Sequence, residues 1–219
     1  MNENFTNNKV FLMGKVQGTP KYSHELYGEG FYEFFLEVSR LSGQTDVIPV
    51  TVSERLMLGG KITDGEKIAV SGQFRSYNKL ENDRSKLMLT VFVRDFLEYD
   101  ENAENPNSVE LNGYICKPPV YRTTPFNREI CDVLLAVNRG YNKSDYIPCI
   151  AWGRNARFVR NIEVGQNIVI NGRIQSRKYN KRISDNEVEE RTAYELSVNK
   201  ISYDRSLSIM ERTEVDEIV

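Results

Sequence analysis

The stretch from Trp152 to Arg182 combines aromatic rings with a local excess of positive charge. It contains eight lysines and arginines but a single acid, Glu163, although the chain as a whole has a net charge of −2. Its cations are Arg154, Arg157, Arg160, Arg173, Arg177, Lys178, Lys181 and Arg182. Because unpaired bases stack on aromatic rings and phosphates bind lysine and arginine, this composition favours contact with single-stranded nucleic acid. The basic run RKYNKR around Tyr179 is, on its own, more typical of a solvated hairpin loop.

The only tryptophan of the chain lies in the segment DYIPCIAW, residues 145–152, which alternates as a β-strand does. One side of that strand would consist of residues suited to a core, namely Ile147, Cys149 and Ala151. Tyr146 and Trp152 would share the other side, about 20 Å apart at roughly 3.3 Å per residue. A lone tryptophan in a strand also suits a core or a domain interface. The alternation and the nearby cations favour a ligand-facing role instead.

The sequence is built from two copies of one plan. NKVFLMG at residues 8–14 returns as NSVELNG at 107–113, and VSR at 38–40 returns as VNR at 137–139. The offset is 99 in both cases and drifts to about 105 towards the ends of the copies, as expected if insertions collect in loops. The sequence therefore predicts a duplicated domain.

Both copies have the period-2 alternation of strands, with a short helical stretch between the third and fourth strands. The expected early strands cover residues 10–16, 31–40 and 46–53 and, in the second copy, 109–115, 130–139 and 145–152. Five strands and one small helix per copy fit a small closed barrel. The predicted fold class is all-β with small helices, as two tandem five-stranded barrels. We assign residues 1–100 to the first domain, 107–205 to the second and 206–219 to an acidic C-terminal tail.

Few residues could support catalysis or bind a metal. The single histidine, His24, lies in a loop-like segment. The cysteines Cys116, Cys131 and Cys149 lack the spacing of a zinc site or a disulfide framework. We therefore expect a non-enzymatic protein without cofactor or metal. No apolar run could span a bilayer and the polar N-terminus lacks a signal-peptide core, so we expect a cytoplasmic location.

In its motifs the chain resembles bacterial single-stranded DNA-binding proteins over nearly its whole length. These motifs are NxVxLxG in both copies, LLAVNRGY at 134–141, DYIPCIAWGRNA at 145–156 and GQNIVINGRIQSRKY at 165–179. Each motif is weak alone, but their order and spacing are specific. The resemblance implies two tandem oligonucleotide-binding (OB) folds. It also implies that the second copy stacks bases on Tyr141, Tyr146, Trp152 and Tyr179.

The first copy departs from this pattern of rings. Its corresponding positions are Ser42, Val47, Ser53 and Tyr77, so one aromatic side chain survives. We therefore expect the second copy to lead binding. The phenylalanines Phe11, Phe31 and Phe35 could partly replace the lost rings, but we expect them to serve packing between the copies or between subunits. The candidate nucleic-acid-binding residues are Trp152, Tyr146, Tyr141, Tyr179, Arg139, Arg154, Arg173, Arg177, Lys178, Lys181 and Tyr77.

These observations predict sequence-tolerant binding of single-stranded DNA in replication, repair or recombination. Two alternatives stay open. One is a primosomal or mobile-element accessory protein whose OB folds mainly mediate protein–protein contacts, and the other is an RNA-binding protein similar to cold-shock barrels. The resemblance further implies a homodimer, which would present four OB folds. The acidic end MERTEVDEIV could recruit replication proteins, although a frayed, solvated terminus would look the same.

Overall fold

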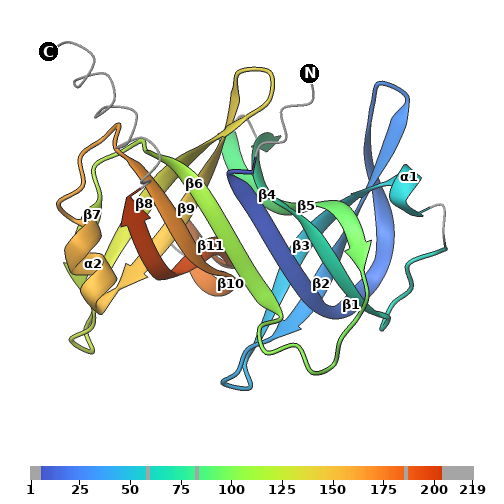
Figure 1. Ribbon diagram of the computed structural model, residues 1–219, viewed down its shortest axis with the longest axis horizontal. Coiled ribbons are helices and arrows are strands. Elements are labelled where there is room, and N and C mark those ends of the chain that lie inside the picture. The colour runs from blue at the N-terminus through green and yellow to red at the C-terminus, as the bar shows by residue number, and fades with distance from the viewer. Residues whose placement is uncertain (1–5, 58–59, 82–83, 185–186, 204–219) are drawn as a thin grey trace, which may run out of the picture.

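A computed structural model describes residues 6–57, 60–81, 84–184 and 187–203, and within them the chain is mostly β-strand (Figure 1). Each half of the chain contains one group of strands. The first group contains β1 (Asn8–Leu26), β2 (Glu29–Ser39), β3 (Thr45–Ser53), α1 (Glu54–Met57), β4 (Lys67–Glu81) and β5 (Arg84–Leu97). The second contains β6 (Asn107–Ile115), β7 (Val120–Thr123), β8 (Glu129–Arg139), β9 (Lys143–Trp152), α2 (Gly153–Val159), β10 (Asn167–Ser184) and β11 (Glu187–Tyr203). The predicted all-β class with small helices is confirmed.

Each group closes into a barrel with the same strand order. In the first barrel β1 pairs with β2 and β4, β2 pairs with β3, and β4 pairs with β5. A short parallel pairing of β3 with β5 closes the ring. The second barrel repeats these pairings with β6, β8, β9, β10 and β11. Closure removes the exposed sheet edges, as in other five-stranded OB-type barrels.

The two barrels differ directly after their first strands. β1 runs on to Leu26 beside β2, with a register shift between Gln17 and Lys21. At the corresponding place the second barrel breaks into β6 and the separate strand β7, which pairs with β8. The break contains Pro118 and Pro119, which have no backbone N–H to donate and so interrupt a strand. The second barrel therefore has one strand more than the five expected.

The repeated NxVxLxG motif has a structural reason in both barrels. The Asn8 side chain forms two 2.8 Å hydrogen bonds with the backbone of Phe74. Asn107 does the same with the backbone of Ile174, at 2.7 and 2.9 Å. The valine and leucine of the motif enter the hydrophobic core. A Cβ atom on Gly14 would lie 2.3 Å from a backbone oxygen of β2, so that position requires glycine.

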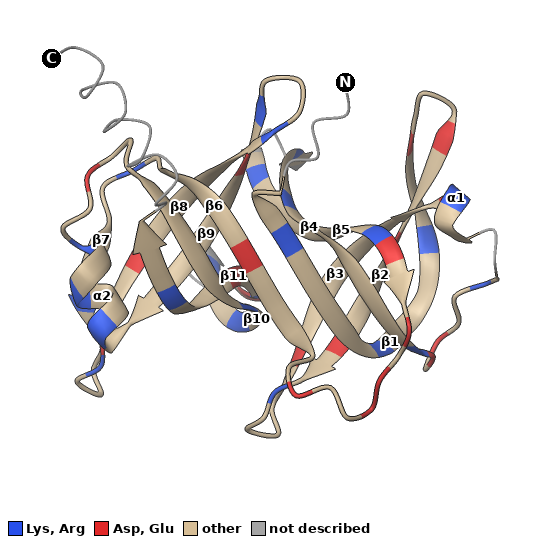
Figure 2. Cartoon of the chain, viewed as in Figure 1, with Lys and Arg blue, Asp and Glu red and all other residues tan. Residues whose placement is uncertain are grey.

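The two barrels lie side by side because β1 pairs with β6 (Figure 1). The pairing is antiparallel and places Val10 opposite Val109, its own counterpart in the repeat. The outer pairs of this pairing are related by the repeat as well: Asn8 lies opposite Leu111, and their counterparts Asn107 and Leu12 also lie opposite each other. The junction therefore has pseudo-twofold symmetry within one chain, like the interface of a symmetric dimer. The segment that connects β5 to β6 carries several acidic residues (Figure 2).

A second set of contacts across the junction follows the same symmetry. Asp46 accepts a 2.8 Å hydrogen bond from the backbone N–H of Ser176 in the other barrel. Asp145 accepts a bond of the same length from the backbone N–H of Ser76. Both aspartates are buried, at 0% and 2% exposure, and a buried charge needs such partners. The barrels are thus joined by specific polar contacts as well as by strand pairing.

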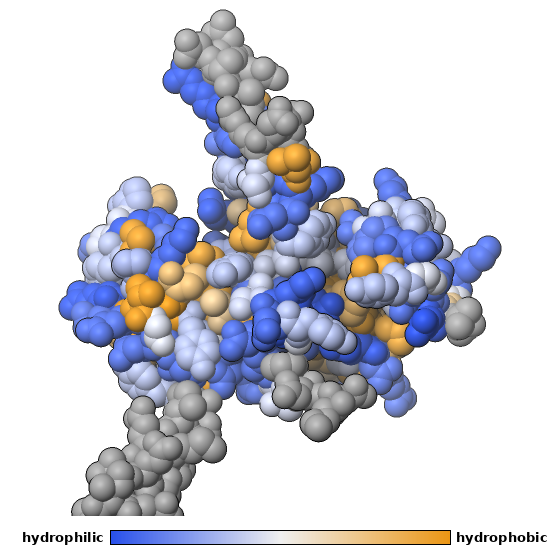
Figure 3. Space-filling view, turned by 90° about the horizontal axis from the view of Figure 1, so that it is seen from above, coloured by the Kyte–Doolittle hydropathy of each residue, from blue (hydrophilic) through white to orange (hydrophobic). Residues whose placement is uncertain are grey.

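Seen from above, the surface is mainly hydrophilic with separate apolar patches (Figure 3). Within the described ranges, no helix combines the length and hydrophobicity needed to cross a bilayer. Over the same residues, no group of metal-binding side chains comes together. The three cysteines are unpaired, and burial raises the pKa of the Cys131 thiol to about 11. That thiol is therefore protonated and unreactive at neutral pH.

Candidate nucleic-acid interface

Strand β9 presents Tyr146 and Trp152 on the outer face of the second barrel, as the alternation predicts. Their neighbours Ile147 and Ala151 are fully buried in the core. Tyr146 is 46% exposed and Trp152 is 37% exposed. Trp152 is the last residue of β9 and lies directly before α2. Its indole is therefore held at the end of a strand and is open to solvent.

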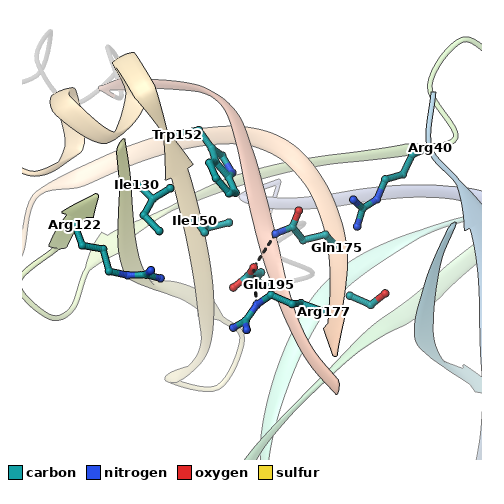
Figure 4. Close-up of a pocket in the computed structure, with 9 residues that line it drawn as sticks. Arg40, Arg122, Ile130, Ile150, Trp152, Gln175, Arg177 and Glu195 are labelled. Atoms are coloured by element: carbon teal, nitrogen blue, oxygen red, sulfur yellow. Dashed lines mark hydrogen bonds and ion pairs between the residues drawn. The ribbon is translucent and has the colours of Figure 1, made fainter. Parts of the chain in front are cut away.

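Trp152 lines an open pocket of about 400 Å³ (Figure 4). The lining of this pocket, which we call the Trp152 pocket, consists of Arg40, Arg122, Ile130, Ile150, Trp152, Gln175, Ser176, Arg177 and Glu195. Ile130 lies opposite Trp152 in the pairing of β8 with β9. Together with Ile150 these side chains form an apolar floor. A volume of this order suits a small organic group, because ligand pockets measure about 300–1,000 Å³.

Guanidinium groups surround this apolar floor. Arg122 extends from β7, Arg177 from β10 and Arg40 from the first barrel (Figure 4). Glu195 is the one acid in the lining. It accepts a 2.7 Å hydrogen bond from Gln175 and lies 3.9 Å from Arg177. Arg122 and Arg40 also pair with Asp132 and Asp46, which lie outside the lining, at 2.8 and 2.5 Å. The site therefore offers guanidinium N–H donors, which suit an anion.

Tyr179 continues this surface along β10. Its ring is 37% exposed, and the guanidinium of Arg177 lies 5.8 Å from the ring centroid. Because these two residues and Gln175 are spaced by two, they point to the same side of the strand. Lys178 and Lys181 are exposed on the same hairpin, and Lys178 pairs with an acid of β11 at 2.9 Å. Rings and cations therefore extend from the pocket along the hairpin.

Of the candidate residues, Trp152 and Arg177 line the pocket, and four others lie on other parts of the molecule. Tyr141 is 99% exposed in the turn between β8 and β9. Arg154 is exposed on α2, where Figure 2 shows positive residues. Arg139 lies at the junction of the barrels, in an ion pair with Asp145 at 3.2 Å. Tyr77 belongs to β4 of the first barrel. A role in binding stays a prediction for these four, as it does for the other candidate residues.

Arg173 lies at the junction of the barrels and does not line the pocket. Its Nη1 atom is 3.6 Å from a carboxylate oxygen of Asp46. The same atom is buried and has no hydrogen-bond partner among the described residues. Burial and the neighbouring charge of Arg40 lower the pKa of Arg173, and Asp46 opposes this shift. Arg173 is thus a partly desolvated cation beside a second arginine.

The sequence analysis missed the residues that complete the pocket. Arg40 had a usable signal, because it is the repeat counterpart of the candidate Arg139. Arg122 follows two prolines in a segment without periodicity, so nothing indicated the extra strand that carries it. Ile150 shares the alternation of Trp152 and is therefore expected on the same side, whereas Ile130 has the composition of a core residue and only its place opposite Trp152 shows that it points outward.

The structure shows that Tyr77 and Tyr179 do not occupy equivalent positions in the two copies. Ser76 and Ser176 are equivalent, since the N–H of each binds an aspartate of the other barrel. Tyr77 follows directly after the first serine, whereas Tyr179 lies three positions after the second. Tyr77 is therefore equivalent to Arg177, because the β10–β11 hairpin is longer than the β4–β5 hairpin beyond this point.

The corresponding face of the first barrel is covered by its own side chains. Ser53, the counterpart of Trp152, is buried and donates a hydrogen bond to a glutamate of β2. The guanidinium of Arg75 lies 3.8 Å from the ring centroid of Phe92, and the ring centroids of Phe92 and Phe31 are 5.7 Å apart. Burial lowers the pKa of Arg75 to about 10. These side chains occupy the face of the first barrel that corresponds to the Trp152 pocket, since Phe31 and Arg75 are the counterparts of Ile130 and Gln175.

The three phenylalanines assigned to packing have different surroundings. Phe31 is buried, but it packs within the outer face of its own barrel. Phe11 lies in β1 opposite Ser108 of β6, at the junction of the barrels. Phe35 is 44% exposed, so packing between subunits stays a prediction for this residue.

The two closed barrels define the class as a tandem OB-fold protein, and the aromatic pocket ringed by arginines is its candidate site. Residues 106–204 match the single-strand binding protein family. The match covers the second barrel, which is less than half of the chain, and it is there that the chain is similar to this family.

Curated relatives match part of the chain. Single-stranded DNA-binding protein 1 of Staphylococcus aureus (strain COL) is 39% identical over 80 residues, which are 33% of this chain and 48% of that protein. Single-stranded DNA-binding protein A of Bacillus subtilis (strain 168) is 36% identical over 80 residues, 33% of this chain and 46% of that protein. The chain therefore spans about half the length of these curated relatives.

Solved structures match over most of the chain. The wild-type single-stranded DNA binding protein from Thermus aquaticus superposes with a TM-score of 0.64 and 22% identity, covering 90% of this chain and 92% of that chain. A deletion variant of the same protein gives a TM-score of 0.68 at 19% identity, covering 90% and 94%. At this level of identity the likeness concerns the fold.

Proposed function

We propose that this protein binds single-stranded DNA without strong sequence preference, through the outer face of the second barrel. The observation that carries the proposal is the Trp152 pocket, in which an exposed indole adjoins an apolar floor and three arginines. A flat ring accepts any base by stacking, and arginine binds the phosphate that every nucleotide carries. The names of the curated relatives support the same ligand.

Each part of the surface has a distinct role in this proposal. Trp152 provides the main stacking surface, and the isoleucines beside it contact the same base. Arg122 and Arg177 bind backbone phosphates at the edge of the pocket. Tyr146 and Tyr179 stack neighbouring bases on either side. The exposed lysines of the β10–β11 hairpin add phosphate contacts further along the strand.

This activity suits a protein that protects or organises single strands during replication, repair or recombination. Such a protein binds and releases DNA without changing covalent bonds, so we propose a binding protein rather than an enzyme. We propose that it acts in the cytoplasm, where bacterial DNA is copied and repaired. Three unpaired cysteines are typical of a reducing compartment.

We further propose that two chains associate, which would bring four barrels together. The pseudo-symmetric pair of barrels in one chain supports this, because it resembles one half of such an assembly. Light scattering of the protein with and without DNA tests the proposal, and a monomer under both conditions would contradict it. Residues 206–219 lie outside the described residues, so contact between this acidic tail and replication proteins stays a prediction.

The single tryptophan makes DNA binding directly testable. Titration with oligo-dT at low salt should quench the Trp152 fluorescence, because a base would stack on the indole. The affinity should fall steeply as salt rises, because phosphate contacts release counterions. Unchanged fluorescence at low salt would contradict the proposal. Competition between matched DNA and RNA oligomers tests the RNA alternative, because only RNA has the 2′-hydroxyl.

A second function is favoured by exposed aromatic side chains of the first barrel. Tyr22 on β1 is 60% exposed, Tyr27 in the turn between β1 and β2 is 96% exposed, and Phe35 on β2 is 44% exposed. Such side chains suit contact with another protein, as in a primosomal or mobile-element accessory protein. A pull-down with purified replication proteins that survives Trp152→Ala and Tyr179→Ala would favour this function. Loss of capture in both variants would exclude it.

A further inference from the structure

Arg40 belongs to the first barrel but lines the pocket of the second. It directly follows β2, and Figure 4 shows its guanidinium pointing towards the pocket from the first barrel. Every other residue of the lining comes from the second barrel. The pocket is therefore completed across the junction.

Asp46 holds the Arg40 side chain in place. Arg40 donates from Nε to Oδ2 at 2.6 Å and from Nη2 to Oδ1 at 2.5 Å. Asp46 is itself fixed by the backbone N–H of Ser176, a residue of the pocket lining, at 2.8 Å. A planar guanidinium bound at two points has little freedom to rotate. Arg40 is therefore presented to the pocket in one orientation.

Two arginines share this single carboxylate. Because Arg173 Nη1 lies 3.6 Å from Asp46 Oδ2, the group of Arg40, Arg173 and Asp46 has one uncompensated positive charge. The same Nη1 atom is buried without a hydrogen-bond partner among the described residues. Arg40 uses three of its five N–H groups in hydrogen bonds to Asp46 and Gln44. Both the charge and the remaining donors suit an anion.

We propose that Arg40 and Arg173 bind a backbone phosphate of the DNA strand whose base stacks on Trp152. This inference rests on the proposed function and adds a path for the strand. A phosphate at Arg40 brings the strand onto the first barrel at the junction, so the DNA crosses between the barrels. The first barrel then contributes to affinity although its own outer face is covered.

The pseudo-symmetry of the junction provides a matched control. Arg139 is the counterpart of Arg40 and pairs with the buried Asp145, which binds the N–H of Ser76. Its charge acts on Arg75, on the covered face of the first barrel. Replacing either arginine by glutamine removes the same kind of ion pair. The two variants should therefore lose similar stability, so thermal unfolding of Arg139→Gln shows what the loss of such an ion pair costs the fold.

The experiment compares the full-length wild type, Arg40→Gln and Arg94→Gln in oligo-dT titrations over a range of salt concentrations. Arg40→Gln should weaken binding about tenfold at low salt, as expected for one charge-assisted contact. It should also reduce the slope of log K against log salt by about 0.7, the value for one phosphate contact in a single strand. Arg94→Gln should keep the wild-type slope, because Arg94 is an exposed arginine of the first barrel outside the pocket lining. Quenching of Trp152 at saturation should persist in all three proteins.

Equal slopes for the three proteins would overturn the inference but leave the proposed function intact, as long as Trp152 is still quenched. Equal losses in Arg40→Gln and Arg94→Gln would also overturn it, because Arg40 would then act only through the overall charge of the first barrel. Absence of quenching in the wild type would defeat the proposed function itself. Thermal unfolding shows whether the variants fold. If Arg40→Gln does not fold, Arg173→Gln decides, since the first barrel has Gln73 at that position and the slope should fall likewise.

Discussion

The two barrels of this chain have the same backbone plan and differ in what covers their outer faces. At the end of the third strand the second barrel has the exposed Trp152, where the first has the buried Ser53. On the fifth strand the first barrel has Phe92, where the second has the small Ser197. The ring of Phe92 therefore closes the face of the first barrel, whereas the ring of Trp152, on the neighbouring strand position, lines an open pocket of the second. Exchange of a large and a small side chain therefore changes what the barrel can bind.

Arg75 and its counterpart Gln175 show the same contrast. The guanidinium of Arg75 lies 3.8 Å from the ring centroid of Phe92, whereas Gln175 donates a hydrogen bond to Glu195 and leaves the pocket open. A cation that covers an aromatic ring of its own protein occupies the surface that a base would need. The comparison teaches that the OB fold alone does not make a binding site. The rings must also be free.

The largest effect is expected when Trp152 is replaced by alanine. Affinity for oligo-dT should fall by about 1–3 kcal/mol, because one base loses its stacking surface. Fluorescence anisotropy of a labelled oligonucleotide measures this loss without the indole. Ser53→Ala, at the counterpart position, should leave the affinity unchanged. Equal losses from the two substitutions would show that both barrels bind DNA in the same way.

A smaller effect is expected when Arg75 is replaced by alanine on the covered face. The free energy of unfolding should fall by about 1 kcal/mol, because the cation–π contact with Phe92 is lost. Affinity for oligo-dT should not fall, since Arg75 lies outside the Trp152 pocket. Urea denaturation and DNA titration measure the two quantities. Arg94→Ala is the control, because Arg94 is an exposed arginine whose guanidinium lies 3.4 Å from the side-chain oxygen of Gln73.

Arg75→Ala could instead increase the number of nucleotides bound per chain. Such an increase would show that Arg75 covers a usable second site and that the first barrel can bind DNA once the ring of Phe92 is uncovered. A loss of affinity equal to that of Trp152→Ala would contradict the distinction between the two faces.

The smallest effect concerns the two buried aspartates of the junction, whose pKa values are shifted in opposite directions. Burial acts to raise both pKa values. At Asp46 the hydrogen bonds from Arg40 and Ser176 and the charges of two arginines outweigh burial, so the pKa lies below its usual value. At Asp145 burial outweighs the N–H and the arginine charges around it, so the pKa lies above its usual value.

These opposite shifts predict opposite pH dependences of stability. Ionised Asp46 stabilises the fold above the unfolded pKa of about 3.9, and this stabilisation is lost as the pH falls through the folded pKa. Asp145 binds a proton more tightly in the folded state, so its contribution is present at low pH and is lost as the pH rises through its folded pKa. Unfolding free energies of Asp46→Asn and Asp145→Asn, measured against the wild type from about pH 7 to pH 3, test this. The deficit of Asp46→Asn should shrink on acidification and that of Asp145→Asn should grow, whereas parallel profiles would contradict the assignment.

The barrels and the exposed tryptophan could be predicted from the sequence. Alternation in β9 reports directly which side chains leave the core, and the internal repeat shows that two similar units follow each other. The asparagine and glycine of NxVxLxG are repeated because backbone groups of β4 and β10 and a close approach to β2 require them. Local sequence pattern contains this information because it concerns neighbours within one barrel.

The pocket could not be predicted, because its parts come from elements whose positions depend on tertiary pairing. Arg40 reaches the second barrel only because β1 pairs with β6. The sequence pattern of neither strand predicts a pairing with a strand of the other barrel. Arg122 depends on β7, a short strand behind two prolines. The contact that covers the outer face of the first barrel could not be predicted either, since Arg75 reaches Phe92 only through the register of β4 with β5.

The pairing of β1 with β6 within a single polypeptide has one more consequence. In an assembly of identical subunits every substitution is present in each copy, so a harmful change at one site damages all of them. Here the covalent connection keeps the two units together at any protein concentration, and each can change on its own. One barrel can then lose exposed aromatic residues and still support its neighbour structurally, while the other barrel retains its candidate binding residues.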